Sequence, residues 1–283
     1  MKNRRRNRVP FILLFLIHTF LLGLSIQRSK SWKKLLVLLF SNMGFSYLFE
    51  YFIFNLFKAY SYQPKILKKK LFDNIFGAFL SQAIYVPFTA VFLTEKKSGW
   101  GSKIGAGGYF YLVEKIFLSL GIFKLAGWKT IYTFILLPFY FKLSDFWFAS
   151  LNKKNSITRF ISLFFMIMVT ETNLLLVLTF LRRYRFGIGK YHSWREHFIM
   201  SPLYTILLSL FTAFSLRKKN NLGVKLGLVL FSASLNKFFT KIKLLKNNLH
   251  PTAYLGKRIL MIFIYGWYRE WVYKDGGNNQ LEN

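Results

Sequence analysis

Long apolar segments alternate with short polar and basic segments along the whole chain. Several of the apolar segments reach the roughly 20 residues that a helix needs to cross a bilayer. We therefore predict an all-α, polytopic helical transmembrane bundle of eight spans, with seven or nine as alternatives. The eight predicted spans are residues 9–26, 35–57, 71–93, 104–126, 130–151, 160–181, 198–216 and 222–239.

The C-terminal part of the chain has a different pattern. Residues 240–251 are basic and amphipathic, and residues 254–273 have an apolar centre of only about ten residues, which is short for a span. The Lys, Arg, Trp and Tyr side chains around this centre are typical of a helix that lies at a membrane interface. We expect a single bundle over residues 1–239, an interfacial segment over 240–273 and a disordered tail over 274–283. No internal sequence repeat is evident, and a degenerate inverted repeat is the alternative.

Small and polar side chains follow one side of the predicted helix at residues 71–93. Residues four apart lie on the same face of a helix, and small residues on such a face let another helix approach closely. The spacing of four joins Asp73, Gly77 and Ser81 and, one residue later, Asn74, Ala78 and Gln82. This face is predicted to pack inside the bundle. The next predicted helix begins with Gly105, Gly107 and Gly108, which permit the same close approach.

A basic cluster precedes the first apolar segment and bears on targeting and orientation. A signal peptide begins in the same way, and Gly23-Leu24-Ser25 is a weak cleavage site. We favour a retained first span, because further spans follow it. The same cluster places the N-terminus in the cytoplasm. The bias toward Phe, Ile, Lys and Asn indicates an A+T-rich, bacterial genome, and so a bacterial cytoplasmic membrane.

The charge of the chain limits its partners and cofactors. The formal net charge is +31, but the Lys and Arg residues form short runs between apolar segments, which favours anionic lipid headgroups over nucleic acid as the partner of these basic loops.

The chain has no cysteine, which excludes disulfides, thiolate catalysis and cysteine-ligated metals. His192 and His197 are five residues apart and do not match the zinc helix motif. We expect no metal and no cofactor.

The acidic residues are scarce and are the best candidates for chemistry. A charged side chain at the centre of a membrane helix costs at least about 2.5–3.5 kcal/mol on insertion scales, so each should face protein or water. The candidate intramembrane functional residues are Glu50, Asp73, Asn74, Gln82, Glu114 and Glu171. The alternative for each carboxylate is a salt bridge that only holds helices together. Lys142 and Asp145, three residues apart, are predicted to form such a structural ion pair.

The length of the loops restricts the function. None is long enough to hold a soluble catalytic domain. We expect a non-catalytic membrane component, such as a scaffold or sensor subunit. The first alternative is a small transporter or permeation protein that uses the intramembrane carboxylates. The second is a membrane-embedded enzyme for lipid phosphates, in which basic loops at residues 65–70 and 182–195 hold the phosphate and Glu50 and Asp73 act as acid/base groups or Mg²⁺ ligands. No motif identifies a catalytic residue.

Overall fold

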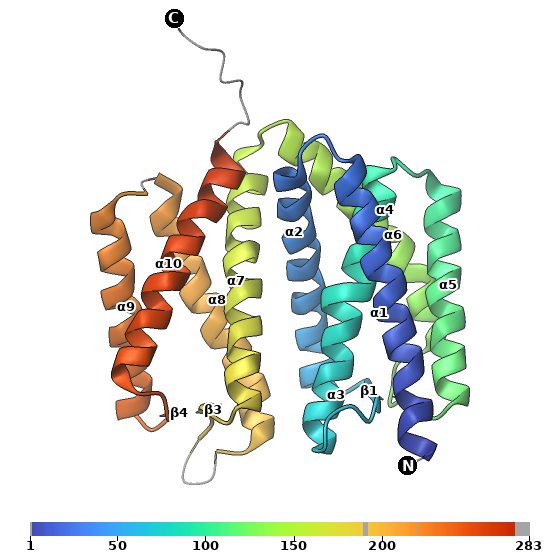
Figure 1. Cartoon of the computed structure of the whole chain (residues 1–283), viewed down its shortest axis with the longest axis horizontal. Helices are drawn as coiled ribbons and strands as arrows, with labels where there is room; N and C mark the ends of the chain where they lie inside the picture. The colour runs from blue at the N-terminus through green and yellow to red at the C-terminus, as the bar shows by residue number, and fades with distance from the viewer. Residues whose placement is uncertain (1, 189–191, 219, 275–283) are drawn as a thin grey trace, which may run out of the picture. The chain divides into compact units, whose positions relative to one another are not determined.

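The computed structural model describes residues 2–188, 192–218 and 220–274, and these residues form helices joined by short loops and two small strand pairs (Figure 1). The chain divides into two compact units, Met1–Asn155 and Ser156–Asn283. The division falls after Asn155, and residues 240–273 lie in the second unit. Apart from Lys274, the predicted disordered tail lies outside the described residues.

In the first unit, two helices pack against a third that contains a π-helical turn. Helices α1 and α2 both pack against the continuous helix of α3, η2 and α4, and α5 packs against α6. The elements are α1 (Lys2–Arg28), α2 (Trp32–Glu50) with the π-helical η1 (Tyr51–Leu56), β1 (Tyr60–Tyr62), α3 (Lys70–Phe79), the π-helical η2 (Leu80–Tyr85), α4 (Val86–Glu95), α5 (Trp100–Ser119), β2 (Phe123–Leu125) and α6 (Thr130–Asn152).

The predicted span at residues 104–126 is wrong at its C-terminal end. Helix α5 ends at Ser119, and Gly121 adopts φ +67°, a left-handed conformation that glycine adopts without strain. Strand β2 follows and pairs antiparallel with β1, with Tyr62 opposite Phe123. The hydrophobic pattern did not predict either strand, because three residues are too few to show an alternation.

The described residues of the second unit form four helices and one strand pair. Helix α7 packs against α8, and α10 lies along α7 and α9 (Figure 1). The elements are α7 (Ser156–Phe180), β3 (Tyr184–Phe186), α8 (Trp194–Lys218), α9 (Leu222–Lys241), β4 (Leu245–Asn247) and α10 (Pro251–Tyr273). Strand β3 pairs antiparallel with β4. Helix α10 buries Arg258 and Tyr265 within this unit.

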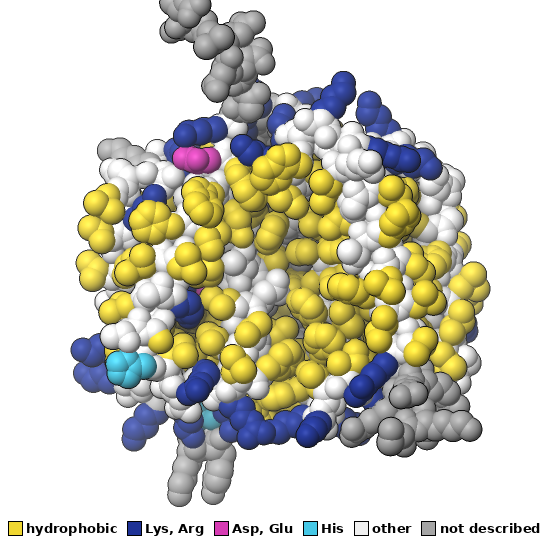
Figure 2. All heavy atoms as spheres, viewed as in Figure 1, with side chains coloured by type: hydrophobic (Ala, Val, Ile, Leu, Met, Phe, Trp, Pro, Cys, Tyr) yellow, Lys and Arg dark blue, Asp and Glu magenta, His cyan; other side chains and the backbone are white. Residues whose placement is uncertain are grey.

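Seven helices among the described residues are long and apolar enough to cross a membrane. They are Asn7–Arg28, Trp32–Leu56, Lys70–Glu95, Thr130–Asn152, Ser156–Phe180, Trp194–Lys218 and Leu222–Lys241. Within each unit, Figure 2 shows hydrophobic side chains over the middle of the helices and Lys and Arg side chains toward their ends. The fold is an all-α helical bundle that is compatible with a multi-pass membrane protein. Helices α5 and α10 are not among the seven.

The close approach expected of the glycines in α5 occurs at Gly107. A Cβ atom on Gly107 would lie 2.9 Å from Pro138 Cγ and 3.0 Å from the Phe134 carbonyl oxygen, both on α6. A Cβ atom on Gly105 would meet nothing within 4 Å, and one on Gly108 would only touch the Phe134 ring at 3.8 Å. The contact between α5 and α6 therefore requires glycine at position 107 only.

We expect Gly107→Val to destabilise the first unit by about 1–3 kcal/mol, as overpacking of a tight contact typically does. The branched side chain would collide with Pro138 and with the backbone of α6. The measurement is the thermal unfolding midpoint of the purified protein in detergent. Gly105→Val is the matched control, since that position faces open space. Equal unfolding midpoints for the two variants would contradict the conclusion that the contact between α5 and α6 requires glycine at position 107.

Candidate ligand cavity in the first unit

A cavity of about 370 Å³ lies among the helices and strands of the first unit. Most of its wall is aromatic and aliphatic, with Phe11 and Leu14 from α1, Phe45 from α2 and Phe110 from α5. Polar side chains interrupt this apolar wall at several places. They are Ser46, Tyr60, Tyr62, Ser81, Gln82, Tyr85, Glu114, Thr133 and Tyr140. The cavity is thus an apolar, aromatic space with a small number of placed polar groups, as small-molecule sites usually are.

The π-helical turn η2 supplies three of these polar residues, Ser81, Gln82 and Tyr85. Such turns are rare and are often found at functional sites. The Tyr85 hydroxyl donates to the Phe11 carbonyl oxygen at 2.8 Å and so attaches α1 to this wall. Pro87 follows directly in α4. The distortion of this helix therefore lies beside the cavity.

Glu114 places a carboxylate in the wall of the cavity. The Thr133 hydroxyl donates to Glu114 Oε2, and the Trp128 indole N–H donates to Thr133 Oγ1 at 3.0 Å. The neighbouring Lys115 does not form an ion pair with Glu114, and its Nζ lies 5.6 Å from the centre of the Tyr111 ring. Among the described residues, Glu114 forms no ion pair.

Glu50 lies next to the cavity, behind Tyr60 and Gln82. The Tyr60 hydroxyl donates to Glu50 Oε2 at 2.5 Å, and the Gln82 side chain also hydrogen-bonds to this carboxyl. Burial, with the nearby Glu50 and Glu114 carboxyls, raises the pKa of Tyr60, so its phenol remains a donor. No ion pair of Glu50 occurs in the described part of the chain. Of the residues singled out in the sequence, the fold thus brings Glu50, Gln82 and Glu114 together around one cavity.

Asp73 and Asn74 lie outside the cavity wall and hydrogen-bond to backbone N–H groups. The Asp73 carboxylate accepts hydrogen bonds from the backbone N–H groups of residues 65, 66 and 67, at 2.7, 2.7 and 2.8 Å. Asn74 Oδ1 accepts from the Tyr62 backbone N–H at 2.6 Å. Asp73 binds the backbone between β1 and α3, Asn74 binds the backbone at the end of β1, and neither side chain lines the cavity. Their contacts fix the path of this segment.

Asp145 has a closer partner than the one expected from the sequence. Lys142 Nζ lies 3.8 Å from Asp145 Oδ2, whereas Lys103 Nζ lies 2.9 Å from the same oxygen. Lys103 is 1% exposed and also donates to the Ser98 carbonyl oxygen. The ion pair therefore joins α5 to α6. The signal available in the sequence was a lysine between glycines at the start of an apolar segment.

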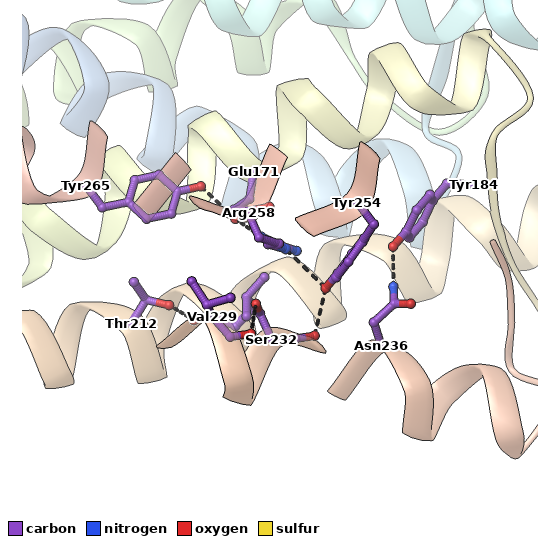
Figure 3. A network of polar contacts seen from close by, with 10 residues as sticks. Glu171, Tyr184, Thr212, Val229, Ser232, Asn236, Tyr254, Arg258 and Tyr265 are labelled. Carbon is purple, nitrogen blue, oxygen red and sulfur yellow. Dashed lines mark hydrogen bonds and ion pairs between the residues drawn. The ribbon is translucent and has the colours of Figure 1, made fainter. Parts of the chain in front are cut away.

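Glu171 lies in the second unit, where it forms a buried ion pair with Arg258 (Figure 3). The Tyr265 hydroxyl donates to Glu171 Oε1 at 2.6 Å, and Arg258 Nε donates to the Tyr254 hydroxyl at 3.2 Å. Glu171 is 1% exposed and Arg258 is 2% exposed. The sequence pattern did not predict Arg258 as a partner, because residues 254–273 were interpreted as an interfacial helix.

Both ring nitrogens of His197 are used within the chain. Nε2 hydrogen-bonds with the Thr179 hydroxyl at 2.8 Å, and Nδ1 accepts from the Phe186 backbone N–H at 3.0 Å. His197 therefore holds β3 against α7 and α8. Within the described residues, no group of three or more His, Asp or Glu side chains is arranged to hold a metal ion.

Comparison with known proteins identifies no relative: no protein-family model, no curated protein and no solved structure matches the chain. The function must therefore be argued from the chemistry of the site.

Proposed function

We propose that the protein is a multi-pass membrane protein that binds a small, largely apolar organic amine in the cavity of the first unit, and that it acts as a non-catalytic sensor or binding subunit. The observation that carries this proposal is the Glu114 carboxyl group, which lies in the wall of an aromatic cavity and forms no ion pair among the described residues. An ammonium group is attracted both to a carboxylate and to aromatic ring faces, while the apolar walls hold the rest of the ligand.

The charges around the cavity favour an amine over an anion. Glu114 lines the cavity and Glu50 lies directly behind it, whereas the described wall contains no Lys or Arg. A phosphate group would find no cationic partner there. The geometry therefore supports the binding function better than an enzyme that acts on lipid phosphates.

A second candidate is transport of the same amine. Glu50 and Glu114 place two carboxyl groups at one cavity, and exchange of a proton for a cation at such groups is a common basis of coupled transport. Uptake of radiolabelled 2-phenylethylamine into proteoliposomes under a pH gradient separates the two candidates. A sensor produces no flux, whereas a transporter produces a flux that Glu114→Gln abolishes.

The test of binding compares 2-phenylethylamine with 2-phenylethanol, which has nearly the same shape but no charge. Trp128 lines the cavity and is one of the seven tryptophans of the chain, so a change in intrinsic tryptophan fluorescence on titration measures binding. We expect the purified protein to prefer the amine, and Glu114→Gln to weaken amine binding by about tenfold, since one lost charge interaction is worth roughly 1.4 kcal/mol or more. Binding of the alcohol should change little.

The matched control is Glu95→Gln, which removes a carboxylate of the same unit away from the cavity wall. It should leave the binding of both compounds unchanged. Equal affinity of the native protein for amine and alcohol, or an unchanged amine affinity in Glu114→Gln, would refute the proposed ligand class.

A further inference from the structure

The elements of the first unit after α1 recur in the same order in the second unit. Each series runs helix, strand, helix, helix, strand, helix. The series are α2 with η1, β1, α3 to α4, α5, β2 and α6 in the first unit, and α7, β3, α8, α9, β4 and α10 in the second. Helices α5 and α9 each have 20 residues, and α6 and α10 each have 23. The two units share one topology.

The same backbone hydrogen bonds close the strand pairs of both units. They are Gln63 N to Ile122 O and Ala126 N to Ala59 O in the first unit, and Gly187 N to Leu244 O and Asn248 N to Arg183 O in the second. Left-handed residues also precede the strands at equivalent places. They are Lys58 and Gly121 in the first unit and Arg182 and Lys243 in the second. Such agreement in backbone detail goes beyond a shared element order.

The sequence carries the same repeat. The pattern K-K-x-x-x-G-x-K-x-G occurs at residues 96–105 and again at 218–227. Phe-Thr-Ala occurs at residues 88–90 and again at 211–213, and its Thr and Ala are buried in both helices. The interval between equivalent positions is 124 residues at β1 and β3, 122 at α5 and α9 and 121 at α6 and α10.

The repeat places the cavity and the buried ion pair at equivalent positions. Four residues that line the cavity correspond to four residues of the polar network in Figure 3. The pairs are Tyr60 and Tyr184, Glu114 and Asn236, Thr133 and Tyr254, and Leu137 and Arg258. In the second unit Asn236 bonds to Tyr184, and Tyr254 and Arg258 bond to each other. Both of these last side chains are larger than their counterparts Thr133 and Leu137.

We infer that the two units are internal repeats of one another, and that one ligand site exists in two forms: open in the first unit, where Thr133 and Leu137 are the smaller side chains, and filled in the second by Tyr254 and Arg258. Thr133 and Leu137 are then the residues that decide whether a unit admits a ligand. Only the identity of that ligand, an organic amine, rests on the proposed function.

The experiment measures the space at equivalent positions with N-ethylmaleimide, which is small and uncharged. The chain has no cysteine, so an introduced one is the sole thiol. Val113 lines the cavity, and Leu235 is its counterpart on α9. In detergent, Val113→Cys should react at least about tenfold faster than Leu235→Cys, because reaction requires access to the thiol.

Filling the first site should slow the reaction. Adding Thr133→Tyr and Leu137→Arg to Val113→Cys should lower its rate to that of Leu235→Cys. The control is Leu112→Cys, whose position is 60% exposed on the outer face of α5 and whose rate should not change. Conversely, Tyr254→Thr with Arg258→Leu, and Glu171→Gln to avoid a buried unpaired charge, should accelerate Leu235→Cys.

Equal reaction rates at positions 113 and 235 in the otherwise native chain would overturn the inference. This comparison tests the inference even if a variant with a filled or an opened site does not fold. A folded filled variant that leaves the rate at position 113 unchanged would overturn it as well. Failure of 2-phenylethylamine to bind would refute the proposed ligand but leave these rates unaffected. The two failures are therefore distinguishable.

Discussion

Arg258→Met is expected to lower the free energy of unfolding by about 3–5 kcal/mol, which is the usual result of removing one partner of a buried ion pair. Glu171 would remain 1% exposed with its cation lost, although Tyr265 still donates to it at 2.6 Å. Methionine is chosen because its unbranched side chain fills much of the space that Arg258 occupies. The measurement is the thermal unfolding midpoint in detergent, followed by tryptophan fluorescence.

The double variant Arg258→Met with Glu171→Leu should recover most of the lost stability, because an apolar replacement of a whole buried pair is often neutral. Lys274→Met is the matched control. It removes the exposed partner of Glu270, a pair that at the surface contributes at most about 0.5 kcal/mol. If Arg258→Met and Lys274→Met had the same thermal unfolding midpoint, the ion pair between Arg258 and Glu171 would not stabilise the fold.

Asp73→Ala is expected to destabilise the first unit by about 3 kcal/mol or more, because hydrogen bonds to a charged group contribute roughly 1.5–3 kcal/mol each. Three backbone N–H groups, those of residues 65–67, would lose their common acceptor. The segment between β1 and α3 should then detach. Limited trypsin digestion at Lys68–Lys70, together with the unfolding midpoint, measures both effects.

Asp73→Asn tests the geometry of this contact, since one carbonyl oxygen remains to accept while the charge is lost. Its midpoint should lie between those of the native chain and of Asp73→Ala. Glu95→Ala, a carboxylate at the end of α4 in the same continuous helix, is the control and should leave the digestion unchanged. Rapid cleavage of the native chain at residues 68–70 would show that Asp73 does not hold this segment.

The hydrophobic pattern was sufficient to predict the all-α bundle, because a period near 3.6 and segments of span length are local properties. The small and polar face of residues 71–93 also predicted a close packing contact. Gly77 packs so closely against Tyr62 that an added Cβ atom would lie 2.4 Å from the Tyr62 Cβ. The period of the hydrophobic pattern does not predict which carboxyl groups lie close together in the fold.

Glu50 and Glu114 adjoin one cavity because β1 and β2 pair, and that pairing joins segments about sixty residues apart through only three residues each. Arg258 escaped prediction for a similar reason, since its burial depends on α7 and α9 rather than on its own helix. The repeat could have been found from the sequence. Lys103 and Lys225 occupy the same place in the pattern K-K-x-x-x-G-x-K-x-G.

The π-helical turn η2 affects which deletions of single codons the gene can tolerate. Before the turn, buried Gly77 corresponds to Ser201 at an interval of 124 residues; after it, buried Thr89 corresponds to Thr212 at an interval of 123. The extra residue is absorbed within Leu80–Tyr85, and both flanks keep their rotational phase. Loss of one codon there would restore an ordinary helix, whereas loss of one codon elsewhere would rotate everything downstream by about 100°.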